Sequence, residues 1–167
     1  NGSKFVTDGS VEAKKIEAGS NASVSLNGGG KITGYKYDDG NTLAASVTGN
    51  STLTATNVDF TGDFKAEGGS KIILKGGSVT ASDYYENGEK NGYTEFGAIG
   101  EGSSVEADGV DIKSATLAKD GANVTIKNSD INTVEGIWAA RKGTINLDGK
   151  ATYTVGEDGI GAFDGGV

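Results

Sequence analysis

The tyrosines of this chain are concentrated in two short polar stretches, and tyrosine is a residue type suited to binding other molecules. Five of the six tyrosines lie in TGYKYDDGNT, residues 33–42, or in SDYYENGEKNGYTE, residues 82–95: Tyr35, Tyr37, Tyr84, Tyr85 and Tyr93. A loop tyrosine offers a large rigid contact area at small entropic cost, together with a hydroxyl, which suits recognition of a protein or a glycan. In the alternative interpretation, these rings pack on the body of the protein and anchor their loops.

A second candidate site combines Leu117, Trp138 and Arg141. Leu117 and Trp138 occupy the same outward slot of a repeated pattern, next to glycines. An exposed strip of this kind could receive the apolar face of a sugar, with Arg141 as a hydrogen-bond donor. Alternatively, a local bulge turns the indole inward, or the ring lies flat as packing.

The composition excludes most catalytic and metal-binding chemistry. The chain has no Cys and no His, which removes thiolate–imidazole metal sites and Cys–His or Ser–His nucleophile pairs. Acidic pairs such as Asp38–Asp39 fall on a loop, a poor platform for two carboxylates that need a fixed separation. The recurring aspartates Asp59, Asp111 and Asp130 are expected to cap turns rather than to bind calcium, because Ser78, Gly30 and Ala151 fall in the same slot of the repeat and interrupt a ladder of carboxylates. We therefore expect no enzyme activity, no cofactor and no metal.

The charge limits the range of partners. A net charge of −8 argues against binding to nucleic acid or to an anionic membrane surface, since both require clustered positive charge. No apolar run approaches the length needed to cross a bilayer, so direct membrane insertion by this segment is not expected.

Short alternating runs of apolar residues, each closed by Gly or Asn, predict the elements that carry these side chains. Seven runs of the form apolar-x-apolar occur, and two residues after each stands Gly or Asn: Gly9, Gly28, Asn57, Gly76, Gly109, Asn128 and Gly149. Gly and Asn both tolerate positive φ, so this column indicates a recurring left-handed turn. Three of the six intervals between these turns are 19 residues long.

Two further patterns complete the repeat. An apolar-x-Ala run recurs at 16–18, 43–45, 64–66, 96–98, 137–139 and 160–162, with 116–118 carrying Thr in the apolar slot. A third short strand appears as Val58-Asp59-Phe60, Val110-Asp111-Ile112 and Ser129-Asp130-Ile131. Three short strands in about 19 residues predict one coil of a β-solenoid whose coils stack in parallel.

The predicted fold is therefore all-β, a single-stranded right-handed parallel β-helix of about seven coils with a repeat of about 19 residues. Its handedness is taken from the general right-handedness of parallel crossovers. Residues 1–167 are expected to form one solenoid segment of a longer parent. The insertions 33–42 and 82–95 interrupt the second and fourth coils at the same point, so both should project from one edge.

The segments GSKIILKGGSVTA, GANVTIKNSDINT and GSSVEADGVDIKS, with the Gly/Asn turns and the absence of Cys, resemble the passenger region of bacterial autotransporter (type V secreted) adhesins. The resemblance extends over all 167 residues without any signature residue, so no site residue is carried over. It implies a right-handed β-helix at the bacterial cell surface, in a parent anchored in the outer membrane, that acts in adhesion, aggregation or toxicity.

From this resemblance we expect a stalk or adhesive segment that contacts a host-cell protein or glycan through the tyrosine loops, or that mediates self-association between cells. Two alternatives stay open. The chain could be a fragment of a β-helical polysaccharide lyase or glycoside hydrolase, or a purely structural spacer.

Overall fold

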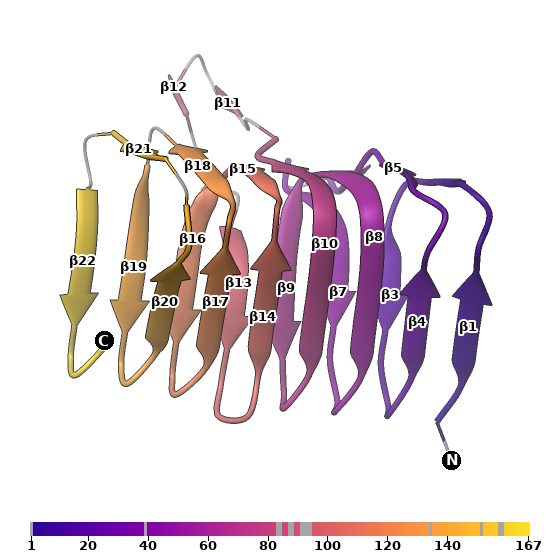
Figure 1. Cartoon of the computed structure of the whole chain (residues 1–167), viewed down its shortest axis with the longest axis horizontal. Coiled ribbons are helices and arrows are strands. Elements are labelled where there is room, and N and C mark those ends of the chain that lie inside the picture. Colours follow the sequence, from indigo (N-terminus) through magenta and orange to yellow (C-terminus); the bar gives the residue numbers. More distant parts are fainter. Residues whose placement is uncertain are drawn as a thin grey trace.

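A computed structural model describes residues 2–38, 40–82, 95–133, 135–150, 152–156 and 159–167, and the backbone strands 85–86 and 89–90. All regular secondary structure in these residues is β-strand. The described part of the chain has no helix with the length and apolarity to cross a bilayer. The strands form two sheets of parallel strands that face each other, with the first sheet in front and the second behind (Figure 1). This architecture is consistent with a β-solenoid.

The first sheet is built on seven parallel strands that neighbour one another in chain order. They are β1 (Lys4–Thr7), β4 (Ser23–Leu26), β8 (Thr52–Thr61), β10 (Lys71–Thr80), β14 (Ser104–Asp108), β17 (Asn123–Lys127) and β20 (Thr144–Asp148). Shorter strands of the same sheet pair along its upper margin: β2 (Val11–Ala13), β5 (Gly30–Ile32), β15 (Asp111–Lys113), β18 (Asp130–Thr133) and β21 (Tyr153–Val155).

The second sheet repeats this order behind the first. Its parallel strands are β3 (Ile16–Ala18), β7 (Thr42–Val47), β9 (Asp63–Glu67), β13 (Glu95–Ile99), β16 (Ala115–Lys119), β19 (Gly136–Ala140) and β22 (Gly159–Phe163). Two small antiparallel pairings arise at the insertions: β6 (Tyr35–Lys36) pairs with β7, and β11 (Tyr85–Glu86) pairs with β12 (Glu89–Lys90) above the body of the molecule (Figure 1).

The strand register confirms the alignment of the seven apolar runs. The paired residues form one continuous column from β1 to β20: Phe5, Val24, Leu53, Ile72, Val105, Val124 and Ile145. Its middle members, Leu53, Ile72, Val105 and Val124, are fully buried. Alternation with period two therefore correctly separates the inward from the outward side chains.

Two predicted alignments are wrong. In β7 the residues in register with Ile16-Glu17-Ala18 are Ala45-Ser46-Val47, two positions beyond the predicted 43–45, because the register shifts between Leu43 and Ala45 where the hairpin with β6 begins. Asp59 pairs with Lys31 rather than standing in a slot shared with Gly30. Ala151, the other residue assigned to that slot, lies outside the described residues.

The interior is filled by one continuous apolar cluster, with aromatic rings at its centre. Phe60 meets Phe64 edge-to-face at 4.8 Å between ring centroids, and Phe64 stacks on Phe96 at 5.5 Å. Such ring pairs add stabilisation beyond the area that they bury.

Buried serines satisfy the backbone where the chain turns from the second sheet into the first. The hydroxyls of Ser51, Ser70 and Ser103 accept hydrogen bonds, each of 3.0 Å, from N–H groups of the preceding coil. A buried N–H group without a partner would be unfavourable, so these serines let the corners close without water.

The predicted turn column is left-handed at five of its seven positions. φ is positive at Asn57, Gly76, Gly109, Asn128 and Gly149, but not at Gly9 and Gly28. The two asparagines also act across coils: a Cβ at Gly76 would lie 2.4 Å from Asn57 Oδ1, and a Cβ at Gly149 would lie 2.3 Å from Asn128 Oδ1. Each asparagine side chain thus occupies the space beside the glycine of the next coil.

Candidate functional site

The first insertion folds into a compact hairpin on the second sheet. Tyr35 of β6 pairs with Leu43 of β7, the Tyr37 N–H donates to the Asn41 carbonyl at 2.8 Å, and the Gly40 N–H donates to the Tyr37 carbonyl at 3.0 Å. Gly40 has φ +88°, a conformation that favours glycine and lets the chain reverse. The hairpin holds both of its tyrosines on the outside of the sheet.

Lys15, in the segment between β2 and β3, fixes the two rings. Tyr35 and Tyr37 pack edge-to-face at 4.9 Å, and the Lys15 Nζ lies 5.2 Å and 5.6 Å from their centroids, within the range of a cation–π contact. The Nζ also lies 3.3 Å from the Tyr37 hydroxyl and 3.0 Å from Glu17 Oε1. The hydrogen bond to Glu17 is the main cause that raises the pKa of Lys15, and the hydrogen bond to Tyr37 raises it further.

The rings are therefore anchored and still accessible. Tyr35 remains 41% exposed and Tyr37 38% exposed. Both interpretations of the loop tyrosines hold in part here, since the rings secure the loop to the preceding coil and leave contact area open to solvent.

A cavity of about 310 Å³ opens beside Tyr37. It is lined by hairpin residues and by outward side chains of β7 and β9: Tyr37, Asn41, Leu43, Ser46, Asp63 and Lys65. Lys65 also forms an exposed ion pair with Glu67 at 3.7 Å. One aromatic ring, one aliphatic side chain and several hydrogen-bonding groups converge, which is the chemistry of a site for a sugar or a short peptide.

Asp63 and Glu95 come together at the edge of this cavity, a juxtaposition that sequence reasoning missed. The Glu95 N–H donates to Asp63 Oδ1 at 3.2 Å. Burial raises the pKa of Glu95, and the charges of Asp63, Glu67 and Glu135 raise it further, while Lys65 opposes the shift. The sequence contained a signal for this contact in its two Phe-x-Ala runs. Phe64 pairs with Phe96, and this pairing brings Asp63 and Glu95, the residues just before them, side by side.

The structure describes the second insertion, residues 82–95, only in part. Tyr84 and Tyr93 lie outside the described residues. Tyr85 is placed by its backbone alone, which pairs with Lys90 across the β11–β12 hairpin. The described residues thus bring together Tyr35 and Tyr37 of the five tyrosines.

Leu117 and Trp138 form a packed strip rather than a projecting one. Trp138 pairs with Leu117 on one side and Gly161 on the other, and both large side chains are half-buried. The indole lies over its own strand, since a Cβ at Gly136 would come within 2.3 Å of it. Arg141, at a turn with φ +46°, is bound to Asp120, with Nε 2.8 Å from Oδ1.

Fold and site together define a class: an all-β protein of stacked parallel strands with a tyrosine hairpin beside a mixed polar and apolar cavity. Across the described residues, no three carboxylates are grouped so that they could hold a metal ion. No family model, curated protein or solved structure matches the chain.

Proposed function

We propose that this chain is an adhesive segment of a secreted bacterial surface protein, a right-handed β-helix of about seven coils that binds without catalysing a reaction. The resemblance to autotransporter passengers supports this proposal, together with the parallel stacking of the strands. The parent protein would be anchored in the outer membrane and would display this segment outside the cell.

The course of the chain supports right-handed winding. In Figure 1 the strands of the first sheet run upward in front, those of the second sheet run downward behind, and the chain advances from right to left. A path that rises in front, descends behind and advances to the left turns in the right-handed sense, as parallel crossovers do in general.

The hairpin at residues 33–42 is the proposed contact surface, and the observation that carries it is the cavity of about 310 Å³ beside the exposed ring of Tyr37. Tyr37 offers a ring face and a hydroxyl, while Asn41 and Lys65 add hydrogen-bond donors. Host glycans and extended peptides both present an apolar face with hydroxyl or amide groups around it, and this lining can recognise either.

Binding to an array of glycans and host surface proteins tests this proposal. Tyr37→Ala should weaken binding roughly ten-fold or more, because it removes a central aromatic contact. Tyr37→Phe, the matched control, keeps the ring and should lose only the contribution of the hydroxyl. Binding that is unchanged by Tyr37→Ala rejects the hairpin as the site, and a chain that binds nothing on either array is a structural spacer.

The pairing of Asp63 with Glu95 favours a second candidate function, polysaccharide cleavage. A carboxyl with a raised pKa next to a second carboxyl is the arrangement used by general acids in glycoside hydrolysis. Release of reducing ends from acidic polysaccharides, abolished by Glu95→Gln, would establish this alternative. Absence of turnover on substrates that bind would leave the adhesive function in place.

A further inference from the structure

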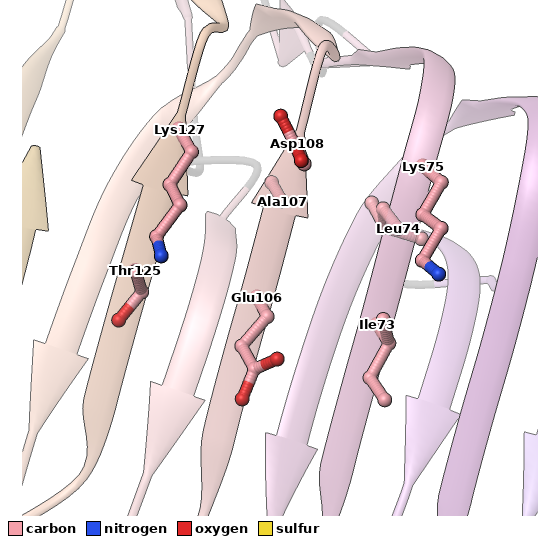
Figure 2. Close-up of a pocket in the computed structure, with 8 residues that line it drawn as sticks. All are labelled: Ile73, Leu74, Lys75, Glu106, Ala107, Asp108, Thr125 and Lys127. Carbon is pink, nitrogen blue, oxygen red and sulfur yellow. The ribbon is translucent and has the colours of Figure 1, made fainter. Parts of the chain in front are cut away.

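The outer face of the first sheet carries a shallow groove on the side of the molecule opposite the tyrosine hairpin. It measures about 380 Å³ and runs across β10, β14 and β17 (Figure 2). Its lining is Ile73, Leu74, Lys75, Glu106, Ala107, Asp108, Thr125 and Lys127. Because this face lies on the other sheet, a role for it is independent of the proposed function of the hairpin.

Charges of opposite sign alternate along the upper margin of this face. Strand pairing places Lys75, Asp108, Lys127 and Asp148 side by side on four consecutive strands. We call these four residues the charged row; Figure 2 shows its first three members projecting from neighbouring strands. All four side chains are exposed.

Among the described residues, the members of the charged row form no ion pair with one another. Asp108 accepts a hydrogen bond from the Asn128 amide, and Asp148 accepts one from the Gly149 N–H. The two lysines therefore keep their full donor capacity for a group outside the chain.

If the strands of the two copies stay aligned, a two-fold axis can bring two identical flat faces together in only two ways. If the axis follows the strands, the rods run antiparallel and the charged row meets itself in reverse order. If the axis follows the rod, the rods run parallel and the row meets the opposite margin of the face, where Lys75 would meet Lys71 of the second copy. The first arrangement joins opposite charges along the whole row. In the second, Lys75 meets a like charge, and the other three members of the row meet the uncharged residues Ser104, Asn123 and Thr144.

We propose that the outer face of the first sheet binds a second copy of this chain, with the two rods antiparallel. The row has four members whose charges alternate in sign. When the row of the second copy runs in the reverse order, each charged residue therefore faces one of opposite sign. Lys75 then meets Asp148 of the second copy, and Asp108 meets Lys127, with each contact occurring twice. In the row below, Glu106 meets Thr125 and Ile73 meets Asn146, so no like charges face each other.

The size of the face indicates a weak, reversible dimer. In this arrangement β10, β14, β17 and β20 of one copy lie over the same four strands of the other. Four strands about 4.8 Å apart and five residues of about 3.3 Å each give roughly 320 Å² per copy. Stable interfaces bury about 800 Å² per partner, and smaller ones are transient. Exposed ion pairs are individually weak and screened by salt, so association should be strongest at low ionic strength.

Exchanging charges within the row tests whether the row contacts a second copy or only stabilises its own sheet. Asp108→Lys places lysine against Lys127 of the second copy, and Lys127→Asp places aspartate against Asp108. The double exchange, Asp108→Lys with Lys127→Asp, breaks the alternation within one sheet, yet restores every opposite-charge contact between antiparallel copies. It also keeps the net charge at −8.

Sedimentation equilibrium over a concentration series, at low and at high salt, measures the effect. Each single variant should raise the dimer dissociation constant roughly ten-fold or more, since like charges then face each other twice. The double exchange should recover the original constant. The two single variants, mixed, should form a heterodimer, because each row is then complementary to the other.

Lys142→Asp is the matched control: Lys142 is exposed at the turn between β19 and β20, outside the charged row, and its replacement changes the net charge as Lys127→Asp does. This variant should leave the dissociation constant unchanged. A chain that stays monomeric at every concentration overturns the proposal. So does a double exchange, folded by circular dichroism, that fails to restore association.

Discussion

The middle and the ends of this molecule contain the same sequence pattern in the same register, yet they differ in burial. Leu53 is fully buried, whereas Phe5, two strands before it in the same column, is 54% exposed. At the other end, Ile137 is 1% exposed and its partner Ile160 is 62% exposed. The pattern sets which way a side chain points, and a neighbouring coil on each side is needed to bury it.

The corners of the coils show the same contrast. Gly76, in the middle, has φ +66° and lies against Asn57 of the preceding coil, whereas Gly9, at the start, has neither a positive φ nor a close backbone neighbour. A coil in the stack is constrained by both neighbours, and a terminal coil by one. The cost of a substitution should therefore depend on where along the stack it falls.

The largest expected difference is between Ile137→Ala and Ile160→Ala. Truncating Ile137 leaves a cavity among packed side chains and should lower the unfolding free energy by about 2–5 kcal/mol. The same change at Ile160 removes a side chain that is mostly in solvent and should cost less than about 1 kcal/mol. Urea denaturation measures both, and equal losses would remove the distinction between middle and end.

A smaller difference is expected between Gly76→Ala and Gly9→Ala. Alanine at Gly76 must adopt positive φ and displace the Asn57 amide, which should lower the unfolding free energy by about 1–3 kcal/mol. Alanine at Gly9 should change it by no more than about 0.5 kcal/mol. In a background carrying Asn57→Gly, the cost of Gly76→Ala should fall to that of the backbone conformation alone. An unchanged cost in that background would exclude a contribution from the amide.

The smallest expected effect concerns Glu95, in the middle of the second sheet, and depends on pH. Because burial raises the pKa of this carboxyl above its ordinary value of 4.5, the folded state binds the proton more tightly than the unfolded state. The free energy of unfolding should then fall as pH rises from the unfolded-state pKa through the folded-state pKa.

Glu95→Gln removes this pH dependence. The variant should melt at a higher temperature than the original protein near neutral pH, and at the same temperature in acid below the window. The exposed Glu12, near the start of the chain, provides the control, and Glu12→Gln should shift the melting temperature little. A Glu95→Gln variant that gains no stability near neutral pH would show that burial does not penalise this carboxylate.

Much of the fold could be predicted from the sequence because alternation and turn residues are local signals. The columns that contain Leu53 and Phe64 follow from period two and from the regular return of Gly or Asn. The register in β7 could not be predicted from the pattern. The apolar-x-Ala pattern matches Leu43-Ala44-Ala45, whereas the residues that pair in register with the neighbouring strand are Ala45-Ser46-Val47. The register is set by the hairpin of β6 with β7, which depends on contacts across the insertion.

The candidate site was partly predictable. The clustering of tyrosines identified the hairpin, but the contact with Lys15 depends on a side chain of the preceding coil reaching across to the rings, which the spacing of residues does not specify. The approach of Asp63 to Glu95 was within reach, because both precede aligned phenylalanines. It was missed because 31 residues, including an insertion, separate those two phenylalanines along the chain.

The asparagine that reaches over the glycine of the next coil has a consequence for how such a chain can lengthen. If the single coil that carries Asn57 were duplicated in tandem, the amide of the first asparagine would overlap the Cβ of the asparagine in the next copy. In the present chain Gly76 occupies that next position and leaves the space open. Duplication of a two-coil unit, Asn57 together with Gly76, creates no such overlap. At this corner, growth by gene duplication is thus favoured in pairs of coils, with the glycine inherited along with its asparagine.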